Sequence, residues 1–268
     1  MRPVLFYSDN YQADIGPHIF PMRKYRLVKE QLLKMGVARL DDFVEPEPAS
    51  VEDALLVHTD MYVAKLLNGT LSALEEATLE LPYSKELVEK SFLGAGGTVA
   101  AVKSSFERGV GVNIAGGLHH AFPDHGEGFC VLNDVAMGVA RALEDELAAR
   151  VATVDCDVHQ GNGTAAIFAG DERVFTFSIH QELNYPMAKP SSNLDIGLPN
   201  GADGPLYLSN LEGALDTIFG EFSPELVLYV AGADAYEHDL LGGLALTKQD
   251  LADRDETVMS ACASRGVP

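Results

Sequence analysis

The chain has 268 residues, 47% of them hydrophobic, and a formal net charge of −21; at this length we expect a single domain spanning residues 1–268 with one sizeable core. So acidic a chain excludes sequence-independent binding of nucleic acid, which needs a basic face. The charge favours a cationic substrate or partner, although acidic surfaces commonly serve solubility alone.

The sequence also bears on the compartment. It has no run of about eighteen apolar residues that could span a membrane, and its first seven residues, MRPVLFY, are too short for the apolar part of a signal peptide. The three cysteines, Cys130, Cys156 and Cys262, form no paired framework. Free cysteines fit a reducing cytoplasm, so we expect a cytoplasmic protein without a membrane partner.

Apolar spacing predicts the elements of the first half of the chain. They are a strand over Pro3–Tyr7, a helix from Pro21 to about Met35 with Tyr25, Val28, Leu32 and Leu33 as its inner stripe, a helical region over Val51–Asn68, a long helix over Ser84–Arg108 and a strand over Val110–Ala115. Within the second of these helical segments, His58 alone is typical of a packed or capping histidine rather than of a metal ligand.

The second half continues the alternation of strands and helices. The expected elements are a helix capped by Asn133 or Asp134, a strand over Arg150–Val154, a helix over Thr164–Ala169, a strand over Arg173–Ile179, an irregular loop to Pro205, a helix over Leu206–Phe219, a strand over Glu225–Ala231 and a helix with Thr247 as N-cap. The loop is too long for a mere connector, so we expect it to line a site. Alternation of this kind is typical of a three-layer α/β fold, with a doubly wound, mostly parallel sheet and helices on both faces.

Polar side chains follow three of the predicted strands. They are His119 and His120 after a Gly-Gly pair, then Asp155, Asp157 and His159, and finally Asp234 after Gly-Ala. Ligands bind at the carboxyl ends of the strands in such sheets, so we expect these side chains to share one edge. Each has an ordinary explanation by itself, such as a helix cap or a surface residue, but their coincidence at one edge favours a site.

Asp157, His159 and Asp234 offer two carboxylates and an imidazole, which are donors that a borderline divalent ion accepts. Three protein ligands leave an open position on zinc, as catalytic zinc sites do. Such a ligand set also accepts Fe(II) or Co(II). His119 and His120 are then free for proton transfer.

Two further residues are placed in the sequence to orient the histidine rings. Asp155 and Asn162 can each accept a hydrogen bond from the far nitrogen of a ring and so fix its tautomer.

These motifs resemble the histone deacetylase superfamily and its arginase–deacetylase fold over nearly the whole chain. The matching segments, in order, are FPMRKY, VHTDMY, GGLHHAFPDHGEGFCVLND, DCDVHQGNGT, SNLDIGLP, AGADAYEHD and LGGLALT. Gln160 and the LGGL segment look closest to the bacterial and class IV branch of that family.

The resemblance implies Asp157, His159 and Asp234 as ligands of one zinc ion per chain, and His119 and His120 as the histidine pair. In the family's mechanism the metal polarises the amide carbonyl and activates a water, the second histidine is the general base, and a protonated histidine assists the leaving amine. The expected reaction is hydrolysis of an acyl group, acetyl first among them, from lysine in a protein or from a lysine-like amine such as a polyamine.

Two more sites are implied by the resemblance. Gly128 and Phe129 match positions that wall the acyl-lysine tunnel. A monovalent-cation site, such as one for K⁺, would be formed by main-chain carbonyls around Asp155, Asp157 and His159 together with Ser178.

One departure keeps other functions open. Family members continue past the last helix into a strand and a glycine-rich turn with a tyrosine that donates to the developing oxyanion, whereas this sequence stops at Pro268. We expect that segment to lie in residues beyond Pro268 or to come from another chain. The alternatives are an inactive acyl-lysine binding module and an arginase-type ureohydrolase, and the second is disfavoured because a two-metal site needs additional Asp and His ligands. The oligomeric state is left open by the sequence.

Overall fold

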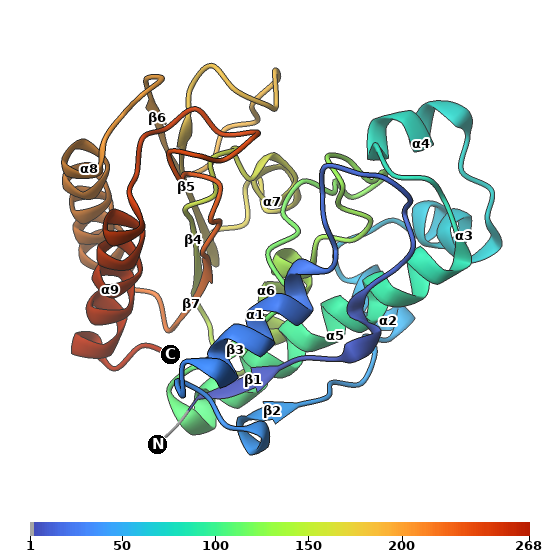
Figure 1. Ribbon diagram of the computed structural model, residues 1–268, viewed down its shortest axis with the longest axis horizontal. Coiled ribbons are helices and arrows are strands. Elements are labelled where there is room, and N and C mark those ends of the chain that lie inside the picture. Colours follow the sequence, from blue (N-terminus) through green and yellow to red (C-terminus); the bar gives the residue numbers. More distant parts are fainter. Residues whose placement is uncertain (1–2) are drawn as a thin grey trace. The chain divides into compact units, whose positions relative to one another are not determined.

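The computed structural model describes residues 3–268. The chain forms two compact units, Met1–Asp145 and Glu146–Pro268, and each combines parallel strands with helices (Figure 1). Among residues 3–268, no helix is long and apolar enough to cross a membrane. The expectation of one domain over the whole chain stays a prediction.

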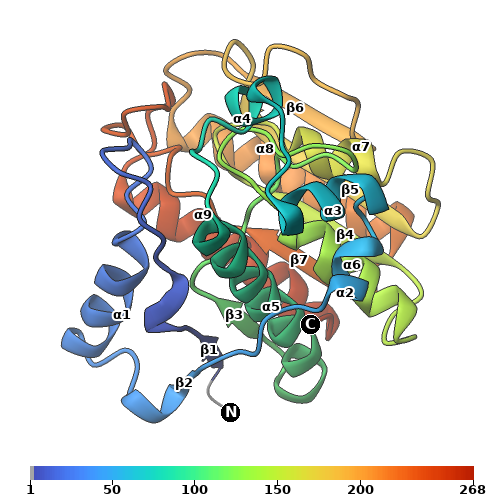
Figure 2. The same ribbon diagram turned by 90° about the vertical axis from the view of Figure 1, so that its right-hand side faces the viewer.

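The first unit contains a parallel sheet with the order β2-β1-β3. Its strands are β1 (Val4–Phe6), β2 (Phe43–Val44) and β3 (Gly111–Asn113). The long helix α5 (Lys85–Arg108) runs alongside β1 and β3 (Figure 2). It begins where the Ser84 hydroxyl accepts the Leu87 N–H at 3.0 Å and ends at Gly109, whose φ is +83°, as the sequence predicts.

The remaining helices of this unit are α1 (Lys24–Lys34), α2 (Val51–Leu55), α3 (Asp60–Asn68), α4 (Ala73–Leu79) and α6 (Asp134–Glu144). The helical region predicted over Val51–Asn68 is two helices, because the Thr59 hydroxyl accepts the Tyr62 N–H at 3.3 Å and starts a new one. Helix α4 was not predicted, although Ser72 and Glu75 form a capping box at its start.

The predicted inner stripe of α1 is wrong in part. Tyr25 is buried, in a cluster with Tyr7, Tyr11 and Ala115, but Val28 is 43% exposed. Apolar spacing identifies the helix but does not tell how much of the apolar face is covered, and here Tyr25 alone anchors α1 in that cluster.

The second unit contains a parallel sheet with the order β6-β5-β4-β7. Its strands are β4 (Val151–Asp155), β5 (Val174–Gln181), β6 (Leu194–Leu198) and β7 (Leu226–Val230). Helices α8 (Gly204–Thr217) and α9 (Lys248–Arg265) pack together and cover one face (Figure 1). The short helix α7 (Asn162–Ile167) follows β4, and a π-helical turn, Ile218–Phe222, extends α8.

Strand β6 corrects the prediction of an irregular loop up to Pro205. It pairs with β5, with Ile196 opposite Ile179. Leu194 and Ile196 are half-buried and Leu198 is buried, whereas Asp195 and Gly197 between them are exposed and interrupt the apolar signal. An edge strand of this kind is specified by its neighbour more than by its own composition.

Helix α9 and the residues after it pack in the second unit. Thr247 and Asp250 form the capping box that starts α9, as predicted. After α9 the Pro268 carbonyl accepts the N–H of Val227 at 2.9 Å, so the last residues run beside β7. The strand and tyrosine expected beyond Pro268 stay predictions.

Candidate metal centre and histidine pair

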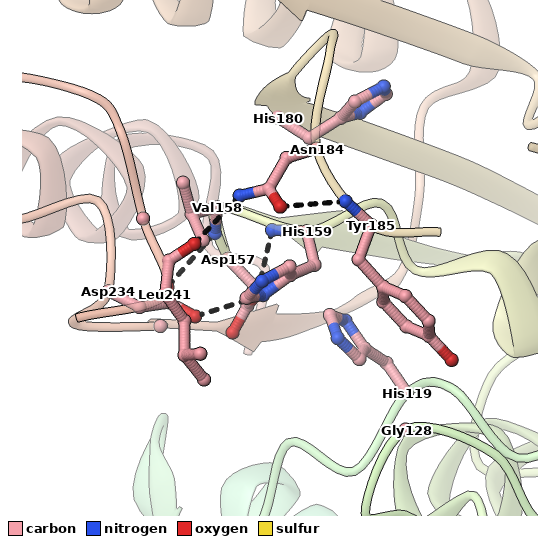
Figure 3. A network of polar contacts seen from close by, with 12 residues as sticks. His119, Gly128, Asp157, Val158, His159, His180, Asn184, Tyr185, Asp234 and Leu241 are labelled. Carbon is pink, nitrogen blue, oxygen red and sulfur yellow. Dashed lines mark hydrogen bonds and ion pairs between the residues drawn. The ribbon is translucent and has the colours of Figure 1, made fainter. Parts of the chain in front are cut away.

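Strands β4 and β7 are neighbours in the second unit, and their carboxyl ends bring together Asp157, His159 and Asp234. One ligand atom from each of these three residues lies within 4.8 Å of the others. Figure 3 shows the three side chains side by side. Parallel pairing explains the grouping, because Asp155 at the end of β4 lies opposite Val230 at the end of β7.

The two carboxylates are oriented by both the ring and the backbone. Nδ1 of His159 lies 3.0 Å from Oδ1 of Asp157 and 3.3 Å from Oδ2 of Asp234. Oδ1 of Asp157 also accepts the backbone N–H of His159 at 2.9 Å, and Oδ1 of Asp234 accepts that of Val158 at 2.9 Å. These bonds are drawn in Figure 3 and hold the three donors in one cluster.

The two neighbouring carboxylates of this cluster favour a positive charge between them. Burial, and then repulsion from Asp157, raise the pKa of Asp234 to about 6 against the opposing effect of its hydrogen bonds. Burial by itself would lower the pKa of His159, but hydrogen bonds to Asp157 and Asp234 outweigh it and raise that pKa to about 10. A divalent ion can take the place of the ring proton between the carboxylates, and two oxygens with one imidazole nitrogen suit such an ion. The residues present therefore fit a metal.

The two strand ends approach each other closely at Gly232. A Cβ at that position would lie 2.5 Å from Oδ2 and 2.6 Å from Cα of Asp157. Only glycine can occupy the position without displacing Asp157, so the loop that carries Asp234 depends on this residue.

The other predicted residues of the second unit surround the strand ends. Oδ1 of Asp155 accepts the backbone N–H of Asp157 at 3.1 Å, and Asn162 is buried at the start of α7. Ser178 lies opposite Asp155 in the sheet, and its hydroxyl is 3.0 Å from Nδ1 of His180. Roles for these residues in ring orientation and cation binding stay predictions.

The predicted histidine pair lies in the first unit. The Nε2 atoms of His119 and His120 are 3.1 Å apart, their ring centroids are 4.1 Å apart, and both residues are buried. Nδ2 of Asn133 donates to the carbonyls of His119 and Ala121 at 3.2 and 3.1 Å. Oδ1 of Asn133 accepts the Ala136 N–H at 2.9 Å and so caps α6, which confirms one of the two predicted caps.

Asp134 fixes the segment just before the pair. Its Oδ1 accepts the N–H of Leu118 at 2.6 Å and its Oδ2 that of Gly117 at 3.2 Å, while Thr98 donates its hydroxyl to the same carboxylate. Burial raises the pKa of Asp134 to about 6, more than these hydrogen bonds lower it. The backbone of the histidine segment is thereby tied to the start of α6.

His58 has the packing role that the sequence predicts. Its Nδ1 lies 2.9 Å from the Phe122 carbonyl, and its Nε2 accepts the Asn133 N–H at 3.1 Å. A carbonyl only accepts and an amide N–H only donates, so the ring is neutral with its proton on Nδ1. Burial lowers its pKa to about 4.

Gly128 and Phe129 lie in a turn of the first unit, with φ of +52° and +67°. The Phe129 N–H donates to the Leu79 carbonyl at 3.0 Å. The Phe129 ring meets the His18 ring edge to face, with centroids 4.9 Å apart. Helix α4 therefore supports this turn, and its tunnel role stays a prediction.

Sequence reasoning missed three residues near the metal group. Tyr185 lies on the long loop with its ring 6.1 Å from the His159 ring at 74°, and Asn184 beside it donates to the Leu241 carbonyl at 2.9 Å. Arg254 is buried on α9 and donates to the carbonyls of Cys156 and Gly232, which follow the two strand ends. The length of the loop was the available signal for Tyr185, since it indicated a site without naming its residues.

Comparison with known proteins gives one consistent family. The histone deacetylase domain matches residues 18–267. The chain is 40% identical over 266 residues to an uncharacterized protein of Picosynechococcus, covering 99% of this chain and 89% of that one. It is 31% identical over 277 residues to histone deacetylase 2 of Arabidopsis thaliana, covering 98% and 72%. A probable deacetylase of Archaeoglobus fulgidus is 30% identical over 268 residues, covering 93% and 74%.

Solved structures agree on the fold. The crystal structure of an HDAC homolog from Aquifex aeolicus has a TM-score of 0.84 at 24% identity, covering 97% of this chain and 76% of that one. The HD domain of HDA15 has a TM-score of 0.81 at 21% identity, covering 98% and 83%. The predicted three-layer α/β fold is confirmed.

Proposed function

Because this chain belongs to the histone deacetylase family, we propose that it is a zinc-dependent amidohydrolase that removes acetyl or other acyl groups from lysine side chains or lysine-like amines. The observation that carries the proposal is the Asp157, His159 and Asp234 group, whose donor atoms lie within 4.8 Å of one another in a chain of this family.

Asp157, His159 and Asp234 would hold the ion through two carboxylates and Nδ1 of the imidazole. A bound divalent ion supplies a Lewis acid for the acyl carbonyl and lowers the pKa of a water. The hydrogen bonds from Val158 and His159 N–H to the two carboxylates restrict their rotation, so the donors are oriented before an ion binds.

His119 and His120 are assigned the proton transfers. With 3.1 Å between their Nε2 atoms, one ring can donate to the other only if one of those nitrogens carries a proton. Such a pair can accept a proton at one ring and release one from the other, as hydrolysis of an amide requires. Asp155 and Asn162 are proposed to orient the two rings, and a K⁺ near Asp155 and Ser178 belongs to the same proposal.

The charge of the chain supports the class of substrate. A net charge of −21 attracts a cationic protein tail or a polyamine and repels acidic substrates. The proposal therefore includes both acyl-lysine proteins and acylated polyamines.

The test is hydrolysis of an acetyl-lysine peptide and an N-acetylated polyamine, with the metal content of the same preparation measured alongside. We expect one metal ion per chain and turnover that is lost on chelation and restored by zinc. Binding of the peptide without turnover would favour the binding module, and two ions per chain would favour the ureohydrolase. Absence of both turnover and metal would contradict the proposal.

A further inference from the structure

One buried side chain ties together the two loops that carry the metal group. Arg254 is 1% exposed on α9. Its Nη1 donates to the Cys156 carbonyl at 3.2 Å and to the Gly232 carbonyl at 2.6 Å. Cys156 directly precedes Asp157, and Gly232 lies two residues before Asp234.

The two carbonyls that Arg254 joins lie just beyond the carboxyl ends of β4 and β7. The Cys156 N–H donates to the Val230 carbonyl at 3.0 Å, at the carboxyl ends of β4 and β7. Immediately beyond, the two segments turn toward Asp157 and Asp234, and Arg254 joins them through the carbonyl of Cys156 on one side and that of Gly232, two residues past Val230, on the other. The guanidinium therefore spans the gap whose width sets the separation of the two carboxylates.

The guanidinium is itself held in one orientation. Asp255 Oδ1 accepts from its Nε at 3.0 Å and from its Nη2 at 2.8 Å. The Tyr229 hydroxyl donates to the same oxygen at 2.6 Å, and the Tyr207 hydroxyl donates to the Cys156 carbonyl at 3.3 Å. Because Asp255 holds the planar guanidinium through Nε and Nη2, the remaining nitrogen, Nη1, is aimed at the two carbonyls in a fixed direction, which the freely rotating ammonium of a lysine would not have.

We propose that Arg254 is a positioning residue that sets the distance between the Asp157 and Asp234 carboxylates and thereby the affinity and geometry of the bound metal. The inference rests on the proposed function only in requiring that these residues bind a metal. A stability role alone does not explain why both carbonyls of the pair belong to the ligand loops, or why a buried cation is kept where an apolar side chain would fill the core at less cost of desolvation.

The experiment compares Arg254→Met and Arg254→Lys with Arg265→Met in the full chain. Arg265 is exposed near the end of the same helix, so its replacement removes the same charge far from the loops. Zinc affinity is measured by competition with a chelator, ligand geometry by the visible absorption of the Co²⁺-loaded protein, and stability by thermal unfolding of the metal-free protein.

We expect Arg254→Met to weaken zinc binding by about 10- to 100-fold, the range found when residues that support metal ligands are replaced, and to change the cobalt spectrum. Arg254→Lys should give a smaller loss, and it carries the test if Arg254→Met does not fold. Arg265→Met should match wild type in affinity and spectrum.

Three outcomes separate the inference from the proposed function. Wild-type affinity and spectrum in the folded Arg254 variants, with only thermal stability reduced, would overturn the positioning role and leave the deacetylase proposal standing. If the Arg254 variants lose zinc affinity but the wild-type protein cleaves no acyl-lysine, the positioning role of Arg254 would be supported and the proposed reaction contradicted. A wild-type chain that binds no zinc would overturn both.

Discussion

Asp234 and Val158 are joined across the ends of two neighbouring strands: Oδ1 of Asp234 accepts the Val158 N–H at 2.9 Å. Val158 stands between Asp157 and His159. This bond therefore fixes the segment that carries those two ligands against the third ligand, Asp234. The carboxylate thus has two functions, with Oδ1 on the backbone and Oδ2 facing His159 at 3.3 Å.

Replacing Asp234 separates these two functions. Asp234→Ala removes both the charge and the backbone acceptor, and the purified protein should no longer contain stoichiometric metal. Asp234→Asn keeps an acceptor for the Val158 N–H but not the charge, so it should retain the wild-type fold and bind metal weakly. Elemental analysis with circular dichroism measures both, and full metal retention in the alanine variant would rule out the ligand assignment.

Gly232→Ala should also abolish metal binding, although position 232 is not a ligand. The added methyl would lie 2.5 Å from Oδ2 of Asp157, so the carboxylate or the loop must move. Gly213→Ala is the matched control, because a Cβ at that exposed helical position has no atom within 4 Å. It should leave metal content unchanged and raise stability by about 0.5–1 kcal/mol. Equal zinc affinity in the two variants would contradict the close approach.

His120→Ala should lower turnover by roughly 10² to 10⁴, as removal of a general base does, with metal content intact. His119→Ala should have a milder or comparable effect. His238 has a side chain that is 73% exposed, and His238→Ala serves as the control with wild-type kinetics. The assay is hydrolysis of an acetyl-lysine peptide, and wild-type turnover in His120→Ala would show that the assigned roles are wrong.

Asn133→Asp tests the support of the histidine pair. The aspartate can still cap α6 but cannot donate to the carbonyls of His119 and Ala121. Loss of these two buried hydrogen bonds should cost about 1–3 kcal/mol each, and displacement of the pair should slow turnover by up to about 100-fold. Ser84→Ala removes the cap of α5 and should cost about 1 kcal/mol at unchanged turnover. A parallel loss of stability in both variants without a kinetic difference would argue against the positioning role of Asn133.

His58 should make stability depend on pH. Its pKa is about 4 in the folded protein against 6.5 for the free side chain, so the unfolded chain binds its proton first as pH falls. The stability from the neutral ring is complete above pH 6.5 and is lost as pH falls toward 4. Between pH 7 and pH 5 the loss is about 2 kcal/mol. Urea unfolding of wild type and His58→Gln at both pH values measures it, and the glutamine variant should lack this part of the pH dependence.

The features that could be predicted from the sequence are those that residues close together in the chain determine. Capping residues and apolar period indicated α5 and α9, and the ends of β4 and β7 indicated that Asp157, His159 and Asp234 would meet. Strand β6 escaped prediction because its pairing with β5 supplies what its own alternating residues do not.

Arg254 illustrates a second limit. Its partners lie 98 and 22 residues away in the chain, and in the sequence it is one charged residue among several on an amphipathic helix. Which face of α9 enters the core depends on the packing of α8 and the sheet. Only the folded chain shows that this arginine is inside.

Cys156, which stands next to Asp157, has a consequence for the choice of metal. It is fully buried in the apolar core of the second unit, and burial raises the pKa of its thiol to about 12. A thiolate would be the softest donor in this segment and would select zinc or copper(I). Because Cys156 lies in the apolar core and outside the group formed by Asp157, His159 and Asp234, the proposed ligands are only oxygen and nitrogen, which accept iron(II) and cobalt(II) as well. We expect the occupant of this group to follow the supply of divalent ions, so that exchange between them would alter the chemistry of the site without any change in the sequence.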